Sequence, residues 1–178
     1  MEDSLGAYID HLELMFFFSG YALPFIIIFF ARKVWSPVTT RRLLSFLPLG
    51  YALAGTLYLG LQLKNLYPDF SQIPDHFQYS FLKIFSLLSI LFWLPAFRKR
   101  PLLSLLHGLV FFSLMIRNIY RELSIPSDGN DFLKNDIKIF SASIILNLAT
   151  LTILIIISLL VARFKRQLRS THTPKTNI

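Results

Sequence analysis

Three long stretches of this chain contain no charged residue, and they limit the folds that the chain can adopt. They are residues 14–31, 43–63 and 139–162, which are 18, 21 and 24 residues long. A helix of about 20 apolar residues can cross the hydrocarbon core of a bilayer. Because apolar residues make up 54% of the chain and charged residues only 16%, the sequence predicts an all-α integral membrane protein.

Two shorter apolar runs, residues 84–97 and 102–116, are separated only by a basic turn. Each becomes long enough to span when the flanking residues at its far end are included. Lys83 and Arg117 would then lie near the outer interface, where long cationic side chains reach the headgroups. The two runs therefore predict a hairpin of spanning helices. The alternative is a re-entrant hairpin, which leaves three spans.

Basic residues are distributed unevenly between the loops that these helices would leave. Twelve Lys and Arg residues lie on one side of the predicted bundle and six on the other, which also receives all ten acidic residues. Cytosolic loops carry an excess of Lys and Arg. The twelve residues that mark the cytosolic side are Arg32, Lys33, Arg41, Arg42, Arg98, Lys99, Arg100, Arg163, Lys165, Arg166, Arg169 and Lys175. A re-entrant hairpin would leave three of them, at 98–100, at membrane depth or on the wrong side, which favours five spans.

We therefore predict a bundle of five transmembrane helices, with the amino terminus outside and the carboxyl terminus in the cytosol. The acidic start of the chain lacks the positive region of a signal peptide, so the first helix is expected to direct insertion itself. The expected single domain is residues 1–168, and residues 169–178 form a flexible basic tail. The expected spans are about residues 14–34, 43–63, 80–97, 101–120 and 138–162.

This topology accounts for the formal net charge of +8 without a nucleic-acid partner. The basic tail is expected to contact anionic lipid headgroups, which attract juxtamembrane cations. The expected partners are therefore the lipid bilayer and either another membrane protein or further copies of the chain. The expected localisation is a cell membrane, either a plasma or an inner membrane.

Polar side chains within the apolar stretches are costly in lipid and are therefore the candidate site residues. Ser143, Asn147, Thr150 and Ser158 share one face of the last predicted helix. The second predicted span carries small residues, which are Gly50, Ala54, Gly55, Thr56 and Gly60. Both patterns are typical of close helix packing in membranes, and they favour packing over a solute pathway.

His107 is the only histidine within a predicted span. It lies about seven residues from the cytosolic end of its helix, or roughly 10 Å deep at about 1.5 Å per residue. Tyr51 of the second span has a similar depth, so we predict a structural hydrogen bond between His107 and Tyr51. Asn147 is too far from the cytosolic end to meet His107. Pro24 is expected to kink the first span.

No carboxylate lies well inside a predicted span, which disfavours ion-coupled carriers and intramembrane metalloenzymes. Two acid–histidine pairs, Asp10–His11 and Asp75–His76, lack fixed metal-ligand spacing, and residues 128–131 lack the spacing of a calcium loop. The sequence contains no nucleophile, zinc-protease or nucleotide-binding motif. We therefore expect no catalytic residue, no metal and no cofactor.

These features predict a small multi-pass membrane protein that is not an enzyme. It would act as a subunit, scaffold or accessory factor through helix packing and its outer loops. The first alternative is an oligomeric channel or carrier for a small solute, lined by Ser143, Asn147, Thr150 and Ser158. The second is a lipid-modifying membrane enzyme whose chemistry would rest on His107 and the outer acids.

Overall fold

The structure is a computed structural model that describes residues 2–31, 33–67, 81–124 and 131–171. The elements within these residues are α1 (Glu2–Phe18), α2 (Ala22–Ala31), α3 (Pro37–Leu66), α5 (Phe81–Leu87), the 3₁₀ helix η2 (Leu88–Trp93), α6 (Pro95–Arg98), α7 (Pro101–Ser124) and α8 (Asp131–Thr171). All of them are helical, so the predicted all-α class is confirmed for the described residues. Most of the two predicted outer loops (68–80 and 125–130) and the end of the tail (172–178) lie outside them.

Four helical segments of the described chain are long and apolar enough to cross a membrane. They are Tyr8–Ala31, Pro37–Asn65, Pro101–Ser124 and Lys134–Phe164. These segments correspond to four of the five predicted spans. The last helix continues to Thr171, beyond the predicted start of the tail at residue 169.

The third predicted span, residues 80–97, is not one continuous helix. It is divided among α5, η2 and α6. Leu94 is extended (φ −71°, ψ 136°), which is the conformation that a proline favours in the residue before it, and Pro95 follows. At about 1.5 Å per α-helical and 2.0 Å per 3₁₀ residue, α5 and η2 together cover roughly 22 Å of a hydrocarbon core about 30 Å thick. A complete crossing by this segment would therefore need α6 as well.

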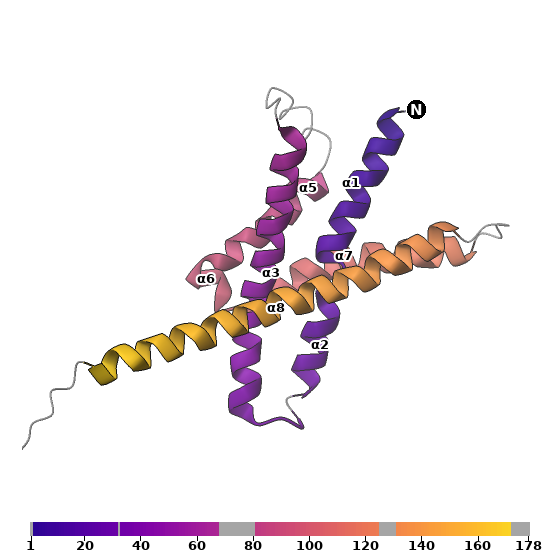
Figure 1. The fold of residues 1–178 in the computed structure, drawn as a ribbon. Coiled ribbons are helices and arrows are strands. Elements are labelled where there is room, and N and C mark those ends of the chain that lie inside the picture. The colour runs from indigo at the N-terminus through magenta and orange to yellow at the C-terminus, as the bar shows by residue number, and fades with distance from the viewer. Residues whose placement is uncertain (1, 32, 68–80, 125–130, 172–178) are drawn as a thin grey trace, which may run out of the picture.

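Helices α1 and α2 follow one another alongside α3, and α8 crosses them obliquely (Figure 1). The most extensive contacts of α8 are with α3 and α1. At about 1.5 Å per residue, α3 is roughly 45 Å and α8 roughly 62 Å long, both more than the thickness of the hydrocarbon core. Helices of this length fit a bilayer when they tilt, so the oblique crossing is compatible with membrane-spanning α3 and α8.

The first predicted span is interrupted rather than only kinked. α1 ends at Phe18, residues 19–21 form a turn, and α2 begins at Ala22. Pro24 explains the position of this turn, because proline has no N–H to bond the carbonyl of Gly20, four residues earlier, and its ring crowds that carbonyl.

Gly20 allows the interrupted segment to approach the backbone of α8. A Cβ atom added at Gly20 would lie only 2.3 Å from the backbone nitrogen of Ile144. Gly55 of α3 packs closely against η2, because a Cβ atom added there would lie 1.9 Å from the Ser89 hydroxyl. At Gly50 an added Cβ atom would lie 3.4 Å from the Leu151 backbone, an ordinary contact distance. Gly60 is different, because nothing lies within 4 Å of an added Cβ atom there.

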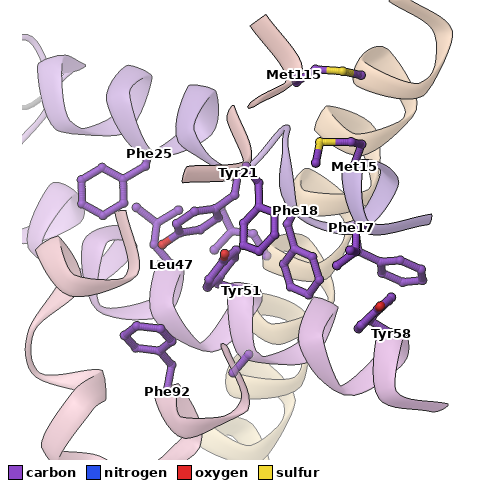
Figure 2. Packing of buried hydrophobic residues seen from close by; sticks show 14 of the residues in the cluster. Met15, Phe17, Phe18, Tyr21, Phe25, Leu47, Tyr51, Tyr58, Phe92 and Met115 are labelled. Carbon is purple, nitrogen blue, oxygen red and sulfur yellow. The ribbon is translucent and has the colours of Figure 1, made fainter. Parts of the chain in front are cut away.

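Aromatic side chains fill the space between α1, α2 and α3, and Figure 2 shows how they converge. The rings of Tyr21 and Tyr51 have their centroids 4.1 Å apart. Phe18 lies beside this pair and contacts Tyr51, Tyr58 and Phe111 at centroid distances of 5.7, 5.4 and 5.0 Å. Helices in lipid gain little from the hydrophobic effect, so such close packing is a main source of their association.

We expect Gly20→Ala to destabilise the protein by about 1–3 kcal/mol, because the added methyl group would push α8 away from the turn at 19–21. Gly60→Ala is the matched control and should be neutral or slightly stabilising, since alanine is the better helix former and the position is open. Thermal unfolding in detergent measures both. Equal melting temperatures for the two variants would contradict the close approach of α8 to the turn at residues 19–21.

Candidate functional site

Two polar side chains of α8 bind the backbone where the first span is interrupted. The Gly20 N–H donates to the Ser143 hydroxyl oxygen (2.8 Å), and the Asn147 side-chain amide donates to the Phe17 carbonyl (3.1 Å). In lipid, an unsatisfied backbone group costs several kcal/mol because no water replaces the lost partner. Ser143 and Asn147 therefore supply hydrogen bonds that the interrupted helix cannot make within itself.

Three of the four polar residues predicted on the last helix belong to this crossing. Ser143, Asn147 and Thr150 are all buried. The Asn147 amide also donates to the Ser143 carbonyl (2.9 Å), and the Thr150 hydroxyl donates to the Asn147 carbonyl (3.0 Å). Ser158 lies two turns further along, is only partly buried, and makes no hydrogen bond to another helix among the described residues. It is therefore not part of the same contact.

The predicted hydrogen bond between His107 and Tyr51 is present. The Tyr51 hydroxyl lies 2.7 Å from Nδ1 of His107, and Nε2 lies 2.8 Å from the carbonyl oxygen of Phe85. A carbonyl oxygen only accepts, so we assign the hydrogen to Nε2, and Nδ1 then accepts from the Tyr51 hydroxyl. His107 therefore connects α3 to α5 through both of its ring nitrogens. His107 and Asn147 bind different partners, as the sequence indicated.

The partner of His107 on α5 lies where the helical pattern changes. Phe85 belongs to the last turn of α5, and the chain continues directly as the 3₁₀ helix η2 from Leu88, in which i→i+3 hydrogen bonds replace those of the α-helix. The rings of Phe85 and His107 stack with centroids 4.3 Å apart and an interplanar angle of 17°. His107 thus binds the backbone at the junction of α5 and η2, whereas Ser143 and Asn147 bind it at the turn between α1 and α2.

A further contact lies one turn earlier in α7. The Tyr21 and Ser104 hydroxyl oxygens are 2.7 Å apart. Ser104 donates to the Pro101 carbonyl (2.7 Å), so its oxygen accepts from Tyr21. A Cβ atom added at Gly108 would lie 2.7 Å from the Tyr21 ring. One face of α7 therefore contacts the closely packed Tyr21–Tyr51 pair through a serine, a histidine and a glycine.

A second group of polar contacts, in the middle of α1, was not predicted from the sequence. Lys83 of α5 forms an ion pair with Asp10 of α1. The Lys83 side chain is only 3% exposed and that of Asp10 is 30% exposed. The prediction that Lys83 reaches toward the headgroups was therefore wrong, because its ammonium group finds a carboxylate inside the protein.

Neighbouring side chains extend this polar group to α3 and α7. Glu13 accepts hydrogen bonds from the side-chain amides of Gln62 (3.0 Å) and Asn65 (3.5 Å). His11 accepts one from the Asn118 amide (2.9 Å). A sequence signal did exist, since Asp10 and Lys83 both lie next to apolar runs. The sequence does not show that these two residues pair, because the pairing depends on how α5 packs against α1.

The candidate metal pairs are only partly described by the structure. In Asp10–His11, the aspartate pairs with Lys83 and the histidine with Asn118, while Asp75–His76 lies outside the described residues. Within the described ranges, no group of three or more His, Cys, Asp or Glu side chains is placed to hold a metal ion.

We expect Asn147→Leu to lower the stability of the protein by about 1 kcal/mol, a typical value for a hydrogen bond between membrane helices. The reason is that the Phe17 carbonyl loses its donor from α8. Ser158→Leu provides a matched control on the same helix and should leave the melting temperature in detergent nearly unchanged. A larger loss for Ser158→Leu than for Asn147→Leu would contradict this assignment.

Substituting one or the other residue of the ion pair between α1 and α5 should lower the stability of the protein by different amounts. Asp10→Ala removes the carboxylate that pairs with the buried Lys83 ammonium and should cost up to about 3–5 kcal/mol, the range for broken buried pairs. Lys83→Met leaves a carboxylate that is partly exposed, and should cost less. Combining Asp10→Ala with Lys83→Met should restore part of the loss. Thermal unfolding measures all three variants, and equal costs for the two single changes would contradict the observed burial.

Comparison with known proteins adds no assignment to this geometry. No protein family, curated protein or solved structure matches the chain. A proposed function therefore rests on the contacts at the turn between α1 and α2, at the junction of α5 and η2, and at the Asp10–Lys83 pair.

Proposed function

We propose that the chain is a multi-pass membrane protein that acts as a structural subunit, scaffold or accessory factor and not as an enzyme. The proposal rests on one observation, which is that the polar side chains within the apolar helices form hydrogen bonds to the chain's own backbone. Ser143 and Asn147 bind backbone groups of the same chain at the turn between α1 and α2, and His107 binds the Phe85 carbonyl at the junction of α5 and η2. Side chains engaged in this way support helix packing and are not presented to a solute or a substrate.

The outer surfaces of the last two long helices support an interaction role. Only 22% of the apolar segment of α7 and 17% of that of α8 are buried, compared with 61% for α1–α2 and 50% for α3. The large exposed hydrophobic residues of α8 among those described are aliphatic except for Phe164, and the aliphatic ones are Ile137, Ile145, Leu148, Ile153, Ile156, Ile157, Leu159, Leu160 and Val161. In a bilayer, such a surface contacts lipid or the helices of another membrane protein.

Five crossings with the amino terminus outside remain the proposed topology. Arg41, Lys99 and Arg163 are exposed and belong to connections that would all face the cytosol. The acidic residues Asp10 and Glu13 belong to α1, whereas the connection to α3 follows the far end of α2 (Figure 1). This separation of charge supports the proposed orientation through the excess of Lys and Arg in cytosolic loops.

A channel or carrier formed by several copies is the second candidate, because interrupted helices are a feature of many transporters. In those proteins the free ends of the half-helices face the substrate. Here the Gly20 N–H and the Phe17 carbonyl bind α8 instead. This difference favours the structural role.

Cysteine labelling tests the topology directly, because the chain contains no cysteine of its own. The single variants Arg41→Cys, Lys99→Cys and Arg163→Cys should react with an impermeant thiol reagent only from the cytosolic side of sealed vesicles. Tyr67→Cys should react only from the outside. Labelling of Lys99→Cys on the same side as Tyr67→Cys would support the re-entrant hairpin and contradict five crossings.

The functional role is tested by purifying the chain from its native membrane in mild detergent. We expect a membrane protein to copurify in fixed stoichiometry, and Ile156→Asn on the exposed face of α8 to weaken this association without changing the melting temperature. Vesicles containing only the purified chain should show no solute flux. Flux that is altered by Asn147→Leu would contradict the structural role and support the carrier.

A further inference from the structure

The first three turns of α3 form a hollow at the end of the molecule opposite the Asp10–Lys83 pair. The hollow has a volume of about 510 Å³ and is lined by Pro37, Val38, Arg41, Arg42 and Ser45. The start of the helix is well defined, because the Ser36 hydroxyl accepts a hydrogen bond from the Thr39 N–H (3.2 Å) and Pro37 occupies the first turn. Both arginines are therefore carried on a regular helical scaffold.

Neither arginine forms an ion pair with an acidic side chain in the part of the chain that the structure describes. No Asp or Glu occurs between Glu13 and Asp69 in the sequence. Glu13 contacts Asn65 near the far end of α3, about 36 Å from Arg41 at roughly 1.5 Å per residue. That distance is several times the Debye length of about 8 Å at physiological salt. Among the described residues, the arginines therefore present a positive surface without a paired carboxylate.

The depth of the arginines fits the boundary between hydrocarbon and headgroups. Tyr21 lies near the middle of the span Tyr8–Ala31, and its ring stacks on that of Tyr51. Arg41 is ten residues from Tyr51 along α3, or about 15 Å, which is half of a hydrocarbon core about 30 Å thick.

Exposed apolar side chains surround the same turns. Val34, Trp35 and Val38 are all exposed, close in sequence to Lys33, which is exposed as well. Apolar and aromatic groups mixed with cations are typical of residues at the membrane interface. The combination suits a ligand that has both an anionic group and an apolar chain.

We propose that this hollow binds an anionic phospholipid. Arg41 and Arg42 bind the phosphate, since a guanidinium group matches phosphate oxygens in a bidentate geometry, and an acyl chain lies along the apolar side of the hollow at Val38. This site rests on the proposed membrane embedding of α3. It gives the chain a preference for one class of lipid in addition to its general contact with the bilayer.

Tryptophan fluorescence provides a local test, because the chain has only two tryptophans. Trp93→Phe leaves Trp35, which precedes α3, as the single reporter. The full-length variant is placed in phosphatidylcholine vesicles that contain a minor fraction of phosphatidylglycerol with brominated acyl chains. With two arginines attracting the headgroup at about 1 kcal/mol each, we expect local enrichment of up to roughly thirtyfold. Quenching of Trp35 should therefore clearly exceed that caused by the same fraction of brominated phosphatidylcholine.

Substitution of the arginines identifies the site. Arg41→Gln combined with Arg42→Gln should remove the excess quenching, whereas Arg98→Gln combined with Arg100→Gln, a matched control on another basic connection, should preserve it. Equal quenching by the two brominated lipids, or excess quenching that survives the Arg41 and Arg42 changes, would overturn the proposed site.

The same system separates failure of the lipid site from failure of the proposed topology. Phosphatidylglycerol is present in both leaflets, so the result does not depend on the orientation of the chain. Trp35→Phe leaves Trp93 of η2 as the single reporter. The Trp93 indole N–H donates a hydrogen bond to the Thr56 hydroxyl of α3. Absence of any quenching of Trp93 by brominated phosphatidylcholine would contradict membrane embedding itself, whereas quenching of Trp93 without lipid preference at Trp35 would contradict only the lipid site.

Discussion

Hydrogen bonding of the backbone at the interruption between α1 and α2 is the constraint on which the rest of the arrangement depends. Pro24 prevents a continuous helix, and an apolar environment offers no water to the groups that are released. The Gly20 N–H and the Phe17 carbonyl find their partners on Ser143 and Asn147. These bonds require α8 to cross close to the turn, and a side chain at position 20 would prevent that approach.

The same principle connects other polar residues within the long apolar helices. His107 binds the carbonyl of Phe85 near the end of α5 and accepts from Tyr51, and the ring of Tyr51 packs against that of Tyr21, which belongs to the turn between α1 and α2. The two segments are thus joined through one aromatic pair and one face of α7. Ser143, Asn147 and His107 all bind backbone groups of the same chain.

The helical class, four long apolar helices and the His107–Tyr51 bond followed from the sequence, because hydropathy and depth along a helix are readable without tertiary contacts. Interruption of the first span at residues 19–21 followed only in part, since Pro24 indicates a kink but not which helix binds the turn. The division of residues 81–98 and the burial of Lys83 beside Asp10 could not be predicted. Both depend on the rotation and tilt of helices, which a linear pattern does not contain.

The large sequence separation of the bonds at Gly20 and Phe17 has a consequence for biosynthesis in a membrane. Their partners on α8 lie 123 and 130 residues later in the chain. At a translation rate of about 5–20 residues per second, the first span waits roughly 6–26 seconds for its partners to be made. Until α8 is made, the Gly20 N–H and the Phe17 carbonyl lack these two partners, so the final hydrogen bonding of the first apolar segment forms only when the last one arrives.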